Sequence, residues 1–152
     1  MSRYRVLLAD DHALFREGLA GIITSQPDMD VVGEASDGLE AVVMAQELKP
    51  DLVLMDVQMP TLDGIEATRQ IKEMVAHATI VMLTVRDDDE KLFEALKSGA
   101  QGYLLKSATP DSIVHAIVEI HRGNTVFDTQ AMEAVRRNLY ASCLISTTDA
   151  AD

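Results

Sequence analysis

The sequence predicts an α/β fold in which one parallel sheet is doubly wound, with helices on both of its faces. Short apolar runs typical of buried strands alternate along the chain with longer stretches whose apolar residues recur at helical spacing. The connections between them are short, which favours right-handed crossovers between parallel strands. Five strands alternating with five helices suit the flavodoxin-like order 2-1-3-4-5, which places the first and third strands side by side.

Two strands and two helices are expected in the N-terminal third of the chain. Residues 5–9 and 30–35 are the predicted strands, and an amphipathic helix lies between them. Asp37 and Glu40 then form a D-x-x-E capping pattern, which is typical of a helix start. The apolar faces of the two helices are predicted to carry Phe15, Leu19, Ile22 and Ile23, and Leu39, Val42, Val43 and Leu48.

The central strand is predicted at residues 52–56, a continuous apolar run that ends on Asp56. By itself this aspartate is an ordinary turn former, so its importance depends on the ends of the other strands. Asp63 and Glu66 repeat the capping pattern and open a third helix. Its inward face is predicted to carry Ile65, Ile71 and Met74.

The fourth and fifth strands are predicted at residues 79–83 and 102–105, and they lead into Thr84 and Lys106. A helix is expected between them over about residues 88–98, where acids in the first turn complement the helix dipole. A last core helix is expected up to Gly123, with Thr109 as cap, Pro110 at its first position and Ile113, Val114, Ile117 and Val118 on its apolar face.

One domain is therefore expected over residues 1–123, followed by a linker helix and a flexible tail over residues 124–152. Apolar residues at helical spacing predict the linker helix up to about Tyr140. The sequence after it has no sustained periodicity, which is typical of a frayed end.

Composition restricts the possible functions. The 152 residues carry a net charge of −12, which argues against nucleic-acid binding by this chain alone and favours a cation or a basic partner. The single cysteine, Cys143, excludes an internal disulfide. Neither a secretory leader nor a membrane-spanning run is recognisable, so a cytoplasmic protein without membrane contact is expected.

Four strand ends are expected to meet at one edge of the sheet, and they present Asp10 with Asp11, Asp56, Thr84 and Lys106. Converging carboxylates repel one another unless a proton, a lysine or a divalent cation offsets their charge. An oxygen-rich site of this kind suits Mg²⁺ or Mn²⁺. Because Mg²⁺ in proteins usually keeps water and phosphoryl oxygens as ligands, the site predicts a phosphorylated ligand or intermediate.

A carboxylate in such a site can act as a nucleophile toward phosphorus and form an aspartyl-phosphate. Asp56 is the candidate because it lies centrally. The ammonium group of Lys106 can neutralise the phosphoryl oxygens, and the hydroxyl group of Thr84 can donate to one of them.

These residues resemble the receiver domain of bacterial two-component response regulators, over about residues 5–122. The similarity rests on the acidic pair at residues 10 and 11, the MD-x-x-MP-x-x-DG segment, Thr84 and the GA-x-GYL-x-K segment. The resemblance implies that Asp56 accepts a phosphoryl group from a sensor histidine kinase and that Thr84 and Tyr103 form the switch pair. It implies metal ligands from Asp11, Asp56 and the backbone carbonyl of Gln58, with Asp10 acting through water.

The ADDH-x-L-F-R-E-G-L opening is similar to that of regulators with a LuxR-type helix-turn-helix, which control transcription. No such pattern fits residues 124–152, so an output domain is not expected here and DNA binding would require one. The resemblance implies a phosphorylation-dependent homodimer. Candidate pairing residues lie on the first and last core helices, namely Leu14, Arg16, Val114 and Val118.

Three other functions share parts of this sequence pattern. A stand-alone receiver would act through protein contacts without an output domain. A phosphatase of the haloacid dehalogenase type resembles D-x-D, but Gln58 occupies the position of its proton donor. A flavodoxin-like cofactor module would need a phosphate cradle where Asp10 and Asp11 stand. His12 follows the acidic pair and is assigned to the start of the first helix. The resemblance implies self-catalysed phosphorylation and dephosphorylation at Asp56 rather than conventional enzyme activity.

Overall fold

A six-stranded parallel sheet forms the centre of the protein, in the order β2-β1-β3-β4-β5-β6. The computed structural model describes residues 3–84, 94–95, 97–124 and 126–127. The strands are β1 (Tyr4–Ala9), β2 (Met29–Ala35), β3 (Leu52–Asp56), β4 (Thr79–Thr84), β5 (Gly102–Leu105) and β6 (Val126–Phe127). The predicted order of the first five strands is confirmed.

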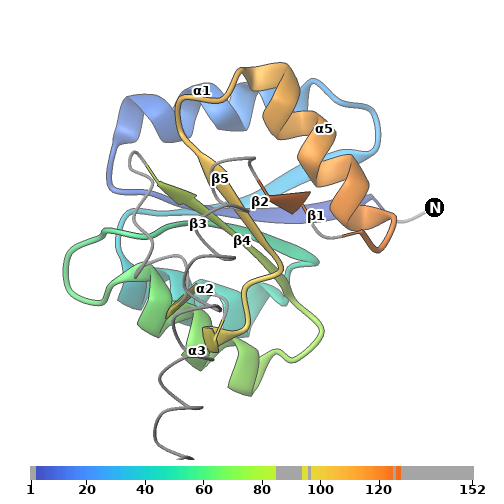
Figure 1. Ribbon diagram of the computed structural model, residues 1–152. Coiled ribbons are helices and arrows are strands. Elements are labelled where there is room, and N and C mark those ends of the chain that lie inside the picture. The colour runs from blue at the N-terminus through green and yellow to red at the C-terminus, as the bar shows by residue number, and fades with distance from the viewer. Residues whose placement is uncertain (1–2, 85–93, 96, 125, 128–152) are drawn as a thin grey trace, which may run out of the picture.

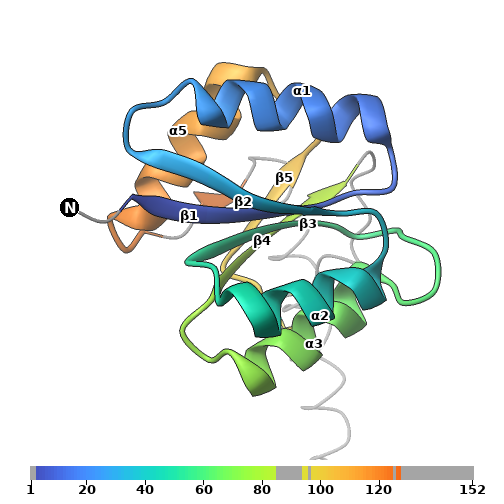
Figure 2. The same ribbon diagram turned by 180° about the vertical axis from the view of Figure 1, so that it is seen from behind.

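Helices cover both faces of this sheet. The helices α1 (Ala13–Thr24) and α5 (Pro110–His121) lie on one face, and α2 (Gly38–Leu48) and α3 (Gly64–Met74) lie on the other (Figures 1 and 2). Residues 94, 95, 97 and 98 are also helical. The rest of the helix expected over 88–98 lies outside the described residues, as do the linker helix and the tail expected after residue 127. Among the described residues, no helix combines the length and the apolar character needed to cross a membrane.

The strand β6 was not predicted. It pairs in parallel with β5, with Val126 beside Gly102 and Phe127 beside Tyr103. Two residues are too few to show the period of a strand, so the sequence carries no signal for it. Sheet pairing therefore continues past residue 123, where the sequence places the end of the domain.

The central strand explains how the sheet separates two apolar cores. All five residues of β3 are buried. Because side chains alternate along a strand, Val53 and Met55 join the core under α2 and α3, whereas Leu52 and Leu54 join the core under α1 and α5. A strand buried on both faces reads as a continuous apolar run, which is the pattern that marked it in the sequence.

The predicted helix caps are present. The carboxylate of Asp37 accepts a hydrogen bond from the backbone N–H of Glu40, and Asp63 accepts one from Glu66. Thr109 caps α5 through the N–H of Ser112. Each cap fixes where its helix begins, so the loops between the carboxyl ends of the strands and these helices stay short.

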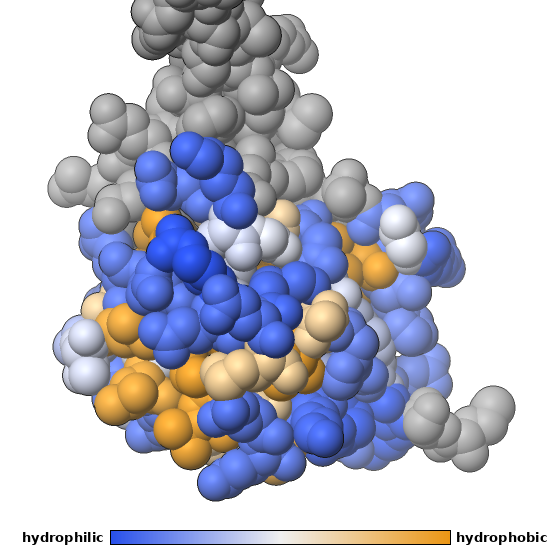
Figure 3. Space-filling model, turned by 90° about the horizontal axis from the view of Figure 1, so that it is seen from below, coloured by the Kyte–Doolittle hydropathy of each residue, from blue (hydrophilic) through white to orange (hydrophobic). Residues whose placement is uncertain are grey.

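Three residues that were predicted to face inward are exposed: Leu39, Val43 and Met74. The inner face of α2 consists of Gly38, Ala41 and Ala45 together with Val42, which was predicted to face inward. Small residues let this helix lie close to the sheet, and a count of large apolar side chains overlooks such a face. Figure 3 looks onto the side of α2 and α3 and shows apolar residues among hydrophilic ones.

Candidate functional site

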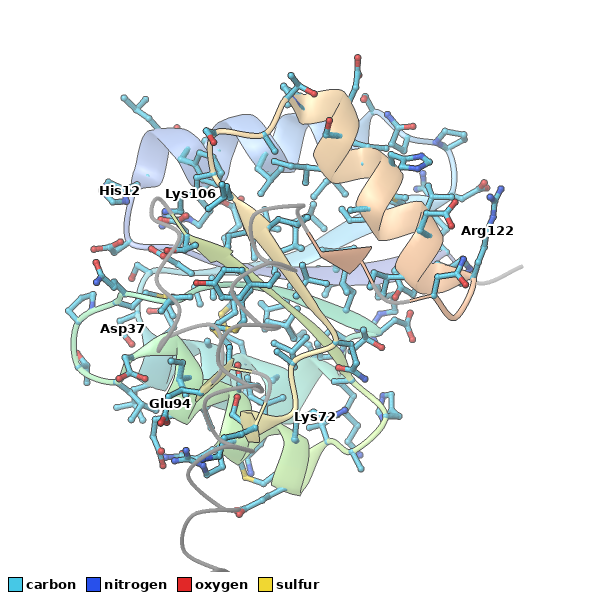
Figure 4. The ribbon with its side chains drawn as sticks, in the orientation of Figure 1. His12, Asp37, Lys72, Glu94, Lys106 and Arg122 are labelled. Atoms are coloured by element: carbon cyan, nitrogen blue, oxygen red, sulfur yellow. The ribbon has the colours of Figure 1, made fainter. Side chains whose placement is uncertain are left out.

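The carboxyl ends of three strands deliver the polar residues of the site. Asp10 follows β1, Asp56 ends β3, and Lys106 follows β5. The strands β1 and β3 are direct neighbours, with Ala9 beside Met55. This pairing brings the acidic residues of the first and third strands together, as the sequence predicted. Figure 4 shows the labelled side chains of His12 and Lys106 close together at this edge of the sheet.

Lys106 lies between two buried carboxylates. Its Nζ atom is 2.7 Å from Oδ2 of Asp10 and 3.2 Å from Oδ2 of Asp56. Only 7% of its side chain is exposed, and the same ammonium lies over the ring of Phe15 at 4.9 Å. The lysine thus offsets part of the repulsion between the two carboxylates, which burial would otherwise make costly.

The carboxyl group of Asp56 is protonated more readily than that of an exposed aspartate. Its pKa is raised from 3.8 to about 6, mainly by burial and also by the charge of Asp10, while Lys106 and the N–H of Gln58 act in the opposite direction. That N–H donates to Oδ1 of Asp56 at 3.3 Å. A cation bound next to Asp56 would therefore lower this pKa and stabilise the charged form of the carboxylate.

Both carboxylate oxygens of Asp10 contact positively charged or hydrogen-bond-donating groups. Oδ2 faces Lys106, and Oδ1 accepts a hydrogen bond of 2.8 Å from the backbone N–H of His12. The backbone carbonyl of Asp10 accepts from Arg16, whose guanidinium also pairs with Glu34 at 3.1 Å. Arg16 thus helps to hold the backbone of Asp10 in place, although the sequence analysis placed it among the candidate residues of a dimer surface.

Four residues offer donor atoms that a metal ion could share. One atom each from Asp10, Asp11, His12 and Asp56 lies within 4.8 Å of the others. Three carboxylates in this group suit a hard divalent cation such as Mg²⁺ or Mn²⁺. The predicted carboxylate donors therefore do come together, and Gln58 follows Asp56 closely enough for its backbone N–H to contact the carboxylate.

Sequence reasoning missed the position of the His12 side chain. The residue is the N-cap of α1, as assigned, but its side chain makes no capping hydrogen bond. Its Nδ1 atom lies 3.4 Å from Oδ1 of both Asp10 and Asp11, and 3.5 Å from Nζ of Lys106. The only signal in the sequence is that this histidine directly follows the acidic pair.

Thr84 and Tyr103 are placed on adjacent strands. Thr84 ends β4 and is buried, and its carbonyl accepts a hydrogen bond of 2.6 Å from the N–H of Lys106. Tyr103 in β5 is fully buried and belongs to the core under α2 and α3. The backbone of Thr84 is therefore coupled directly to the lysine of the site.

Gly64 explains the DG pair after the central strand. Its N–H donates to the carbonyl of Val57 at 2.9 Å. A Cβ atom at this position would lie 2.0 Å from the backbone oxygen of Asp56. Only glycine lets α3 begin this close to the end of β3, so this residue supports the backbone of the candidate nucleophile.

Known proteins resemble this chain in sequence and in fold. The sequence pattern described as the response regulator receiver domain matches residues 6–118. The chain is 46% identical over 127 residues to the uncharacterized transcriptional regulatory protein YxjL of Bacillus subtilis. That alignment covers 84% of this chain but only 58% of the relative, so the chain spans somewhat more than half of the relative's length.

Solved structures share the fold over most of the chain. A two-component response regulator of the LuxR family from Aurantimonas sp. superposes with a TM-score of 0.84 at 34% identity, covering 91% of this chain and 99% of that one. The response regulator domain of Thermotoga maritima CheB gives 0.71 at 41% identity, covering 80% and 95%. With the family pattern spanning most of its residues, the chain belongs to the response regulator receiver domain family and is a receiver domain of two-component signalling.

Proposed function

We propose that Asp56 accepts a phosphoryl group from a sensor histidine kinase, in a reaction that requires Mg²⁺ or Mn²⁺. The observation that carries this proposal is the position of Asp56 at the end of the central strand, 3.2 Å from the ammonium of Lys106 and beside the acidic pair. Intact-mass analysis after incubation with a small phosphoryl donor tests it, with Asp56→Asn as the matched variant.

The transfer makes one bond and breaks one. A carboxylate oxygen of Asp56 attacks phosphorus, and the bond between phosphorus and the donor nitrogen breaks with its electron pair passing to that nitrogen. The proposed metal ligands are Asp11, Asp56 and the backbone carbonyl of Gln58, with Asp10 contributing through water. A divalent cation held there would neutralise phosphoryl oxygens during the transfer.

Lys106 changes partners in this proposal. Before transfer its ammonium pairs with the carboxylates of Asp10 and Asp56. Once Asp56 becomes an acyl phosphate, the negative charge lies on the phosphoryl oxygens, and the ammonium can pair with one of them. Thr84 and Tyr103 are the proposed switch residues. The hydroxyl of Thr84 can donate to another phosphoryl oxygen, and its carbonyl already accepts a hydrogen bond from the N–H of Lys106.

Downstream action is proposed to pass through transcription. The relative from Bacillus subtilis is named as a transcriptional regulatory protein, and the Aurantimonas protein as a LuxR-family regulator. We assign residues 1–123 to the receiver unit and residues 124–152 to a linker that begins on the receiver's sheet, because β6 pairs with β5. Any DNA contact would be made by an output domain outside this chain, since the net charge of −12 opposes a polyanion.

Self-association is the proposed means of control, and a stand-alone receiver acting by protein contact would use the same kind of surface. An apolar groove of about 190 Å³ lies between α1 and α5, and Leu14 on its rim is 87% exposed. Val118 is a poorer candidate for this surface than the sequence suggested, because it packs against the core.

A further inference from the structure

His12 is spaced from the acidic pair as one metal ligand is spaced from the next. Its Nδ1 atom lies 3.4 Å from Oδ1 of Asp10 and 3.4 Å from Oδ1 of Asp11. Two atoms that bind one ion at about 2.1 Å each lie roughly 3.0–3.4 Å apart when they occupy adjacent coordination positions. The imidazole of His12 and the carboxylate of Asp11 are therefore spaced to bind the same ion, with Asp10 contributing through water as in the proposed function.

The backbone holds His12 in this position independently of any metal. Its N–H donates to Oδ1 of Asp10 at 2.8 Å, and its extended backbone, with φ −90° and ψ 98°, starts α1. Residues at this position usually use their side chains to cap the helix. The imidazole of His12 makes no such bond and faces the carboxylates instead, so the side chain is not required for the helix.

We propose that Nδ1 of His12 adds a nitrogen ligand to the acidic site and makes this receiver prefer first-row transition ions more strongly than an all-oxygen site would. Imidazole suits ions such as Co²⁺ and Zn²⁺, whereas Mg²⁺ takes oxygen ligands and keeps several waters. The choice of metal ion affects function only if Asp56 is phosphorylated in a metal-dependent reaction, so this part of the inference rests on the proposed function. The coordination itself is a separate property.

Calorimetric titration of the full chain with Co²⁺ and with Mg²⁺ tests the proposal. We expect His12→Asn to weaken Co²⁺ binding at least about tenfold while changing Mg²⁺ affinity less than about twofold, because only the transition ion loses a preferred ligand. Asparagine is a favoured N-cap residue and 68% of the His12 side chain is exposed, so the variant should fold. His115→Asn, an exposed histidine on α5, is the matched control and should leave both affinities unchanged.

A direct readout separates coordination from a structural role. In protein labelled with ¹⁵N at histidine, Zn²⁺ should shift the Nδ1 resonance of His12 and leave that of His115 in place. Equal losses of Co²⁺ and Mg²⁺ affinity in His12→Asn, unchanged Co²⁺ affinity, or a stationary Nδ1 resonance would each overturn the inference.

Phosphorylation with Mg²⁺ is measured on the same samples. If wild-type protein is phosphorylated at Asp56 but His12→Asn binds Co²⁺ normally, the inference about His12 fails and the proposed function stands. If Co²⁺ binding depends on His12 but Asp56 is never phosphorylated, the proposed function fails and the coordination stands.

Discussion

The Nζ atom of Lys106 lies 3.2 Å from Oδ2 of Asp56, although the two residues are 50 positions apart in the sequence. The same ammonium lies 2.7 Å from Oδ2 of Asp10. One side chain thus joins the carboxyl ends of β1, β3 and β5. The proposed chemistry of the receiver and its stability therefore depend on the same contact.

Lys106→Ala should lower the free energy of unfolding by about 2 kcal/mol in metal-free protein, because it leaves two buried carboxylates without their cation. Asp56 can take up a proton in the variant, so the loss of stability is smaller than it would be if this carboxylate had to stay charged. Urea denaturation measures the effect. Arg69→Ala is the control, since its pair with Glu66 lies on the surface and should contribute less than about 1 kcal/mol. Equal losses in the two variants would refute the central role of Lys106.

The raised pKa of Asp56 predicts a specific pH dependence of stability. This pKa is raised from 3.8 to about 6, chiefly by burial, so between these pH values the folded protein binds more protons than the unfolded chain. The free energy of unfolding of metal-free protein should therefore fall as the pH rises from about 4 to 6. Asp56→Asn should remove this component and be more stable at pH 7 by on the order of 1 kcal/mol. The same slope in wild type and variant would contradict the assignment.

Gly64→Ala should destabilise the protein by at least about 2 kcal/mol, because its Cβ atom would lie 2.0 Å from the carbonyl oxygen of Asp56. Phosphorylation should also slow, since the backbone of the nucleophile must shift. Gly21→Ala in α1 is the matched control. Nothing lies within 4 Å of a Cβ atom there, so alanine should stabilise that helix by up to about 1 kcal/mol. Thermal unfolding of the two variants should move in opposite directions.

Leu14→Glu should weaken self-association of the beryllofluoride-treated protein, because it places a charge on the rim of the groove between α1 and α5. Leu39→Glu is the matched control, since Leu39 is also exposed, at 52%, but lies on the opposite face of the sheet. Sedimentation velocity of both variants distinguishes the surfaces. Dimerisation that survives Leu14→Glu and is lost with Leu39→Glu would move the interface to α2.

Patterns in the sequence predicted the sheet and the convergence of its strand ends. An apolar run such as residues 52–55, closed by turn residues, is typical of a buried parallel strand, and the topology then brings Asp10, Asp56 and Lys106 to one edge. The capping residues Asp37 and Asp63 also predicted where their helices begin, because a cap is a local hydrogen bond.

Other features depend on contacts that no local pattern encodes. The inner face of α2 is built on alanines, so Leu39 and Val43 were placed on the wrong side. The His12 imidazole lies beside Asp10 and Asp11 only once the chain has folded, and the pairing of β6 depends on the neighbouring strand β5. Such arrangements follow from packing in three dimensions and become visible only in the structure.

The most direct test of the proposed function is intact-mass analysis of the chain after incubation with a small phosphoryl donor. With Mg²⁺ present, wild-type protein should gain the mass of one phosphoryl group, and a chelator should prevent the gain. Asp56→Asn should not be modified, whereas Asp51→Asn, at the opposite end of β3, should be modified like wild type. Undiminished labelling of Asp56→Asn, or labelling that ignores the chelator, would contradict the account.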